Sequence, residues 1–318
     1  EGWRKLLCNV YFSTFLTLAF GFLLTKMRFS GPKLTWNQEI NGGKLTAATD
    51  LDIEYTKPEY HYNATLYAKR VYNGWGHAEP ETELRFGPNI KDWPEMPALT
   101  DDLLVKVCSY ITDPVTTTDE LIPSGETSSY RSNPERLSEF ALSRRDPQYV
   151  SRSKEVRQIE RNREAGKALP EEVLNVYAAL TKAGIANDPA HTDIGSTIFA
   201  NMPGDGSARE QAASCQRVMG AAANFAKQYA TKRYRSNCIN WGMTPFLVEN
   251  PEVFALGDYI FIPGLRQAVL ENKASFSAYV VKADGTVTEF PVSTGALTEP
   301  ERQIIADGCL INYYRNNQ

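Results

Sequence analysis

The chain has 318 residues, a formal net charge of −4, 42% hydrophobic residues and 23% charged residues. These values are ordinary for a globular protein of about two domains with a sizeable core. They exclude a disordered chain, and the net charge gives no global reason to expect nucleic-acid binding.

An apolar run lies near the N-terminus. Residues 6–25 are twenty uncharged, largely apolar positions, with basic residues on both sides. This length fits a signal sequence or one membrane span. We interpret residues 1–42 as an apolar segment outside the fold, upstream sequence joined to a truncated gene, because the chain starts at Glu1 and not at Met. Membrane association through residues 6–25 is the alternative.

The remainder divides by composition into a linker and a domain. Residues 43–100 are rich in Tyr, Pro and Trp and show little helical periodicity, which predicts an extended interdomain linker. Residues 101–318 are predicted to form one α/β domain. Its first strand is Leu103–Cys108, and an exposed helix falls within residues 144–167, where eight Lys or Arg face four Asp or Glu. A charge run of this kind is usually a solvated face, and RNA or lipid binding is the alternative.

Further elements follow from patterning and turn residues. Pro170 near its start and Gly184 past its end delimit an amphipathic helix that reaches Lys182. The strand Ile194–Ala200 precedes a glycine-rich loop, and the helix after that loop is predicted to run from Ala208 to Ala226. Toward the C-terminus we expect strands at Tyr259–Ile262, Ala278–Lys282 and Thr286–Pro291, and a helix from Glu299.

The loop Gly204-Asp-Gly-Ser-Ala-Arg209 carries the most specific chemistry. Two glycines allow a tight turn and a close approach of the backbone to a ligand. Ser207 falls at the predicted helix N-terminus, where free N–H groups and the helix dipole favour negative charge. Arg209 adds a planar fork that suits a carboxylate. The alternative is structural, with Ser207 serving only as a helix cap.

The segment Gly204–Ala213 resembles the Gly-x-Gly-Ser-Ser-Arg-Glu-His-Ala signature of the aconitase and isopropylmalate isomerase superfamily, with Ala208 and Gln211 as departures. A second segment, Asp113–Pro123 followed by Ser128–Ser132, resembles the family's Thr-Thr-Asp-His-Ile motif and its active-site Arg.

The spacing of these motifs agrees with the family. Asp119 and Arg131 are twelve residues apart, as in aconitases, although Glu120 replaces the family's His. Arg217–Gly220 and Asn237–Pro245 follow in the expected order. The resemblance covers residues 43–318 and implies an aconitase-type swivel domain with a mixed β/β/α arrangement, preceded by a linker.

The resemblance also implies a function. The chain would be the C-terminal part of an aconitase-like hydro-lyase of tricarboxylic acid metabolism that acts on a di- or tricarboxylic hydroxy acid. Ser207 would be the base, with Arg209 and Asp119 beside it in the catalytic set. Arg131 and Arg209 would bind substrate together with Gly206 and Ala208. Alternatives are the small subunit of a two-chain isomerase and a non-catalytic binding module, which could be tethered to a membrane.

The iron–sulfur cluster of this family is expected elsewhere. None of the five cysteines has the C-x-x-C spacing of a cluster or zinc site, so we expect no metal ligands in this chain. The resemblance implies a 4Fe-4S cluster in the complete enzyme, held by partner domains upstream or in a separate chain. The scattered cysteines and the family indicate a cytoplasmic location, or the mitochondrial matrix in a eukaryote.

The cysteine pattern predicts that the purified chain contains no iron and has no hydratase activity alone. Metal analysis and absorption spectroscopy test this directly. Stoichiometric iron and sulfide with a cluster absorption band would contradict it.

Overall fold

The computed structural model describes residues 57, 59–69, 74–83 and 85–317, so the apolar segment 1–42 and the first part of the predicted linker lie outside the described residues. The chain divides into two units, Glu1–Thr82 and Glu83–Gln318. The described residues of the first unit are largely exposed and include the short helix α3, Ala64–Ala68.

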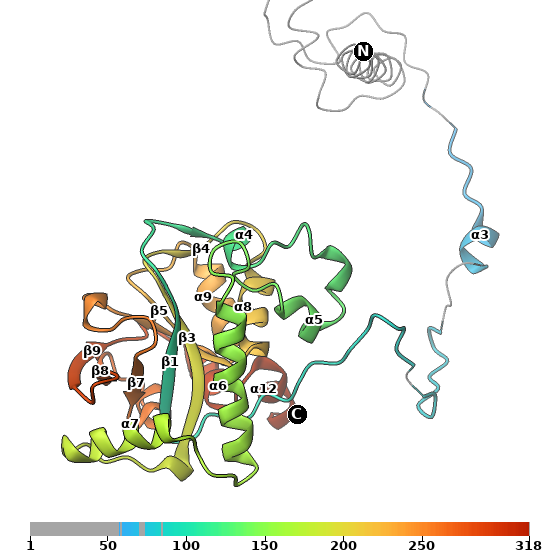
Figure 1. Ribbon diagram of the computed structural model, residues 1–318. Helices are drawn as coiled ribbons and strands as arrows, with labels where there is room; N and C mark the ends of the chain where they lie inside the picture. The colour runs from blue at the N-terminus through green and yellow to red at the C-terminus, as the bar shows by residue number, and fades with distance from the viewer. Residues whose placement is uncertain (1–56, 58, 70–73, 84, 318) are drawn as a thin grey trace, which may run out of the picture. The chain divides into compact units, whose positions relative to one another are not determined.

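One mixed sheet organises the second unit, with the strand order β6-β5-β3-β1-β7-β8-β9 (Figure 1). Strands β1, β3, β5 and β6 are parallel to one another, and β7, β8 and β9 continue the sheet in antiparallel fashion. The bounds are β1 Asp102–Ile111, β3 Thr192–Ala200, β5 Ala221–Ala226, β6 Thr244–Leu247, β7 Tyr259–Ile262, β8 Phe276–Val281 and β9 Val287–Val292. A bridge between Leu247 and Ser293 joins the two edges of the sheet, which therefore curls.

Helices cover both faces of this sheet. They are α4 Thr118–Leu121, α5 Pro134–Ser138, α6 Tyr149–Glu164, α7 Glu171–Lys182, α8 Arg209–Val218, α9 Lys232–Asn240, α10 Leu265–Leu270, α11 Glu299–Ala306 and α12 Leu310–Asn316. Short 3-10 turns occur at Ser128–Tyr130, Pro189–His191 and Pro251–Val253. The predicted α/β class is confirmed.

Alternation along β1 builds the core on each side of the sheet. Leu104 and Cys108 belong to one buried cluster, which also takes in side chains of α6, α7 and α8. Leu103 and Val105 belong to the other, which includes side chains of α10 and α11. Because both faces are covered, β1 and β3 are buried along nearly their whole lengths.

Most predicted elements are present, but one helix is shorter than predicted. The helix expected to reach Ala226 ends at Val218, and the Ala-rich segment Ala221–Ala226 is the buried strand β5. Gly220, with φ of 99°, reverses the chain between the two elements. Alanine favours a helix locally, but β5 lies between two neighbours in the sheet, and burial there overrides that preference.

The segment Trp93–Thr100, here called the strap, packs on the second unit beside its last helices. The Leu99 N–H donates to the Ala306 carbonyl at 3.1 Å. The Thr100 N–H donates to Asp193 Oδ2 at 2.9 Å. A Cβ at Gly308 would lie 2.0 Å from the Pro97 carbonyl oxygen, so the strap and the end of α11 are in backbone contact.

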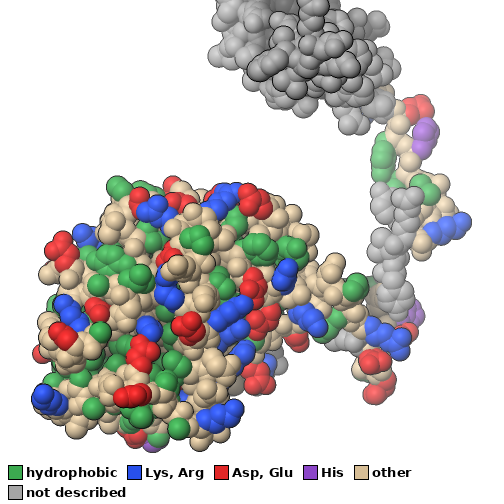
Figure 2. All heavy atoms as spheres, in the orientation of Figure 1, with side chains coloured by type: hydrophobic (Ala, Val, Ile, Leu, Met, Phe, Trp, Pro, Cys, Tyr) green, Lys and Arg blue, Asp and Glu red, His purple; other side chains and the backbone are tan. Residues whose placement is uncertain are grey.

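The basic run 144–167 is paired with acids. Figure 2 shows basic and acidic side chains interspersed over the face that carries α6. Seven of the eight Lys or Arg in this run form ion pairs with carboxylates: Arg144, Arg145, Arg152, Lys154, Arg157, Arg161 and Arg163. This pattern is that of a solvated, mutually neutralised face rather than a basic patch.

The contact of Gly308 with the strap predicts a stability difference between two glycine variants. Gly308 and Gly257 have similar φ values, 89° and 93°, but a Cβ at Gly257 meets nothing within 4 Å. Gly257→Ala should cost only the backbone strain, about 1–2 kcal/mol. Gly308→Ala should cost about 1–3 kcal/mol more, because it also overpacks against the strap. Urea denaturation of the two variants measures this difference, and equal losses would refute the contact.

Candidate active site

The loops that follow the parallel strands meet at the carboxyl ends of these strands, here called the carboxyl edge of the sheet (Figure 1). Asn201 Nδ2, after β3, donates to the Thr112 carbonyl, after β1, at 2.7 Å. Thr231 Oγ1, after β5, donates to the Gly204 carbonyl at 3.2 Å. Ligands of α/β sheets bind in the space outside this edge.

A two-stranded ribbon brings the two sequence motifs together. Strand β2, Thr116–Thr117, lies in the Asp113–Pro123 motif, and β4, Pro203–Asp205, leads into the Gly204–Ala213 motif. They pair in parallel, with Thr117 opposite Asp205. The residues that immediately follow, Asp119 on one side and Ser207 on the other, are therefore carried by adjacent segments of chain.

Two glycines, Gly204 and Gly206, make this approach of the two motifs feasible. A Cβ at Gly206, which has φ of 127°, would lie 2.2 Å from Thr118 Oγ1. A Cβ at Gly204, with φ of 97°, would lie 2.3 Å from the ring of Tyr234. Only glycine satisfies both the dihedral angle and the space at each position.

The buried ring of Tyr234 packs against this loop, and the sequence did not predict this contact. Its hydroxyl accepts hydrogen bonds from Gln216 Nε2 at 3.0 Å and Asn224 Nδ2 at 3.1 Å. Burial raises its pKa well above the ordinary value, so the phenol stays neutral. Nothing in the local sequence around Tyr234 signals this role, because its partners lie on α8 and β5.

Ser207 lies just before α8 and does not cap it. The helix begins at Arg209, its N-cap residue is Ala208, and no side chain makes the capping hydrogen bond. The Ser207 side chain is exposed, and its hydroxyl makes no hydrogen bond within the described part of the chain. Ser207 thus lies one residue before the N-cap position, whereas the sequence placed it at the helix N-terminus. The alternative that Ser207 serves only as a helix cap therefore loses its main support.

Arg209 has an unused hydrogen-bond donor. Its side chain is half-buried, and Nε is shielded from solvent without a hydrogen-bond partner among the described residues. A buried guanidinium donor that lacks a partner is costly unless an anion or water satisfies it. The first turn of α8 adds free N–H groups next to this side chain.

Asp119 and Arg131 are exposed residues of the loop after β1. Asp119 is in α4, where it forms an ion pair with Arg144. Arg131 directly follows the turn Ser128–Tyr130, and its Nη2 donates to the Ser124 carbonyl at 3.4 Å. Among the described residues, no hydrogen bond or ion pair joins Asp119, Arg131, Ser207 and Arg209 to one another.

Glu120, the departure from the family pattern, has a structural task here. Its carboxylate accepts from the Thr117 N–H at 2.7 Å, and its own N–H donates to Thr117 Oγ1 at 3.2 Å. This reciprocal capping box starts α4 and so places Asp119. The Thr-x-x-Glu spacing is the sequence signal that could have revealed it.

The described cysteines do not fit an iron–sulfur cluster. Cys108, Cys215, Cys238 and Cys309 are buried and free. Burial raises the pKa of the Cys108 thiol to about 11 and that of Cys238 to about 12, whereas iron binds thiolates. Among residues 57–317, with the gaps given above, no three His, Cys, Asp or Glu side chains group as a metal site requires.

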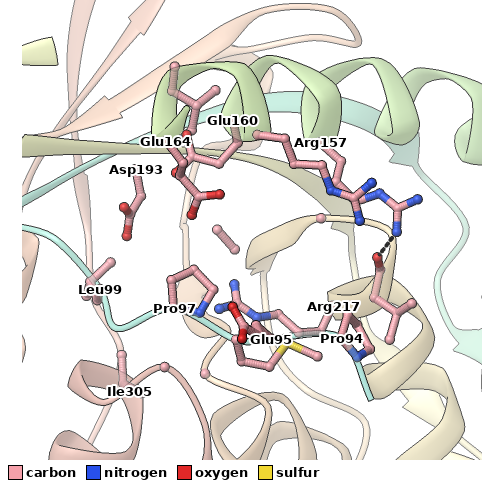
Figure 3. Close-up of a pocket in the computed structure, with 18 residues that line it drawn as sticks. Pro94, Glu95, Pro97, Leu99, Arg157, Glu160, Glu164, Asp193, Arg217 and Ile305 are labelled. Atoms are coloured by element: carbon pink, nitrogen blue, oxygen red, sulfur yellow. Dashed lines mark hydrogen bonds between the residues drawn. The ribbon is translucent and has the colours of Figure 1, made fainter. Parts of the chain in front are cut away.

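A separate cavity of about 120 Å³ lies at the amino end of β3, where Asp193 and residues of the strap line it. Figure 3 shows its lining side chains. Asp193, Glu160 and Arg217 line it together with Pro94 and Pro97. Burial raises the pKa of Asp193 and of Glu160 and lowers that of Arg217. Arg217, whose Nη1 donates to the Ala221 carbonyl at 3.2 Å, therefore lines this cavity and not the Ser207 loop.

The fold and the carboxyl-edge loops define an α/β protein with two motif loops held in register. No family model and no curated protein matches the chain. Among solved structures it is similar to 3-isopropylmalate dehydratase (leuD) from Methanocaldococcus jannaschii DSM2661, at 19% identity and a TM-score of 0.41, over 67% of this chain and 95% of that one.

Within the described residues, no helix is both long and apolar enough to cross a membrane. The run 6–25, which prompted the alternative of a membrane span, lies outside them.

The cap geometry predicts how two variants differ in stability. Ser207→Ala should change the free energy of unfolding by less than about 0.5 kcal/mol, because it removes an exposed hydroxyl that caps nothing. Thr231→Ala is the matched control, since Thr231 Oγ1 accepts from the Tyr234 N–H at 3.2 Å, and it should cost about 1 kcal/mol. Urea melts compare the two, and a loss of 1 kcal/mol in Ser207→Ala would restore the structural role.

Proposed function

We propose that this chain supplies half of the active site of an aconitase-like hydro-lyase. Such an enzyme removes water from a di- or tricarboxylic hydroxy acid to form a carbon–carbon double bond, and adds water back across that double bond. The observation that carries the proposal is a pair of neighbouring side chains. The Ser207 hydroxyl does not cap α8, and Arg209 Nε has no hydrogen-bond partner among the described residues. Both residues follow β4, which pairs with β2, the strand that leads to Asp119. The other half belongs to cluster-bearing domains, in the same protein or in a second chain.

Ser207 is the proposed base toward carbon. A serine hydroxyl is a weak base in water, so it acts only where its alkoxide is stabilised by fixed donors and positive charge. The first-turn N–H groups of α8 and the Arg209 guanidinium supply these next to Ser207. The hydroxyl is available for this task because no cap hydrogen bond occupies it.

Arg209 and Arg131 are the proposed carboxylate ligands, with Gly206 and Ala208 giving close backbone approach. A guanidinium binds a carboxylate through two parallel hydrogen bonds, which fixes both position and orientation. Arg209 Nε has no competing partner among the described residues, and Arg131 has only a long bond to a carbonyl. Asp119 orients these groups rather than reacting.

The four described cysteines do not fit the cluster, so the step in which hydroxide leaves is assigned to the partner domains. Ser207 and Asp119 are exposed in this chain. A partner that covers this edge would exclude water from it and strengthen the electrostatic interactions there.

Two variants in the chain reconstituted with a cluster-bearing partner test the proposal. Ser207→Ala should lower kcat about 10²–10⁴-fold with little change in KM, because the base acts only in the transition state. Arg209→Lys keeps the charge and loses the fork, so kcat should fall and KM should rise. Steady-state kinetics with citrate and with 3-isopropylmalate measures both effects.

Matched controls are an exposed serine and an exposed arginine of α6. Ser151→Ala and Arg161→Lys should leave kcat and KM within about twofold. Near-normal turnover in Ser207→Ala would remove Ser207 from the chemistry and leave the loop as a turn.

A further inference from the structure

Arg144 joins the two halves of the loop that follows β1. Its Nη1 donates to Asp119 Oδ2, and its Nη2 donates to Glu126 Oε1. Asp119 lies in α4, whereas Glu126 lies in the turn that leads toward Arg131. One planar guanidinium therefore holds two carboxylates from different segments, which an ammonium group could not do in the same geometry.

The backbone that carries Arg144 is itself fixed to α4. Leu142, two residues earlier, is fully buried and has φ of 54°, a conformation that is uncommon for a bulky apolar residue. Its N–H donates to the carbonyl of Leu121, the last residue of α4, at 2.9 Å. The Arg144 side chain is thus projected from a base that the core holds in place.

The other carboxylate belongs to a compact turn. Thr127 donates through its N–H and its Oγ1 to the Pro123 carbonyl, at 3.2 and 3.0 Å. The Arg131 guanidinium lies against the same turn through the Ser124 carbonyl. A displacement of this turn would therefore move the backbone on which Arg131 rests.

We propose that Arg144 is a positioning residue that sets the separation between Asp119 and Arg131, and through it the spacing of the carboxylates that the site accepts in a substrate. The inference rests on the proposed function for the roles of these two residues. The geometry itself, with one guanidinium between α4 and the Pro123–Thr127 turn, stands without it.

The ion pairs of Arg144 with Asp119 and Glu126 contribute little to the folding stability of the protein. The side chains of Arg144, Asp119 and Glu126 are 43%, 56% and 67% exposed, and exposed ion pairs contribute little to folding. The hydrogen bond to Glu126 raises the pKa of Arg144, and the charge of Asp119 raises it further, so the Arg144 guanidinium stays charged. Arg145 provides a matched control, because it is similarly exposed and, within the part of the chain that the structure describes, forms an ion pair with one carboxylate, that of Asp113.

The experiment uses Arg144→Ala, Arg144→Lys and the control Arg145→Ala in the full chain. The first measurement is the amide order parameters of the ligand-free protein by ¹⁵N relaxation. Arg144→Ala should lower them in both 118–121 and 123–131 with an unchanged melting temperature, and Arg145→Ala should leave them unchanged there. Unchanged order parameters in Arg144→Ala, or equal effects of the two alanine variants, would overturn the inference.

The second measurement is kinetic, in the reconstituted enzyme. Arg144→Ala should lower kcat/KM for citrate or 3-isopropylmalate about 10–100-fold, Arg144→Lys should not restore it, and millimolar guanidinium should restore it in the alanine variant alone. Full activity in Arg144→Lys would overturn the bridging role. If the unsubstituted enzyme turns over neither substrate, the proposed function fails, and the order parameters alone decide whether Arg144 positions the loop.

Discussion

The candidate site depends on the absence of a side chain at Gly206. A Cβ there would lie 2.2 Å from Thr118 Oγ1, so the two motif loops can touch only because the residue is glycine. The parallel pairing of β2 with β4 uses that closeness to fix the register between the loops. Segments almost ninety residues apart in sequence thereby become neighbours at the carboxyl edge of the sheet.

Sequence patterns located the elements with strong local signals and failed where long-range contacts decide. Strand β7 and the helix α7 were predicted with nearly their observed bounds, because a bounded apolar run and Pro/Gly punctuation are local features. Strand β5 was predicted as helix, since its alanines are helix formers and only its neighbours make it a strand. Strands β2 and β4, of two and three residues, are too short for periodicity to register.

In the candidate site too, local sequence signals were predictive and long-range contacts were not. The motifs named Ser207, Arg209, Asp119 and Arg131 from sequence, and the structure adds how the two loops are registered. The capping role of Glu120 was available in the Thr-x-x-Glu spacing. The bridge from Arg144 to Asp119 and Glu126 was not, because those partners are 25 and 18 residues away and no period relates them.

The strap has a consequence for how the chain is made. Its residues touch parts of the chain that come much later, since Asn312 Nδ2 donates to the Met96 carbonyl across 216 positions. Proteins are synthesised from the N-terminus at about 5–20 residues per second, so the strap emerges many seconds before the helix ends that it packs against. During that interval Met96, Val218 and Met219, which form one buried cluster with Cys309, cannot complete their packing. The strap therefore docks late, only after the last helices have been synthesised, and until then this apolar patch stays exposed to chaperones.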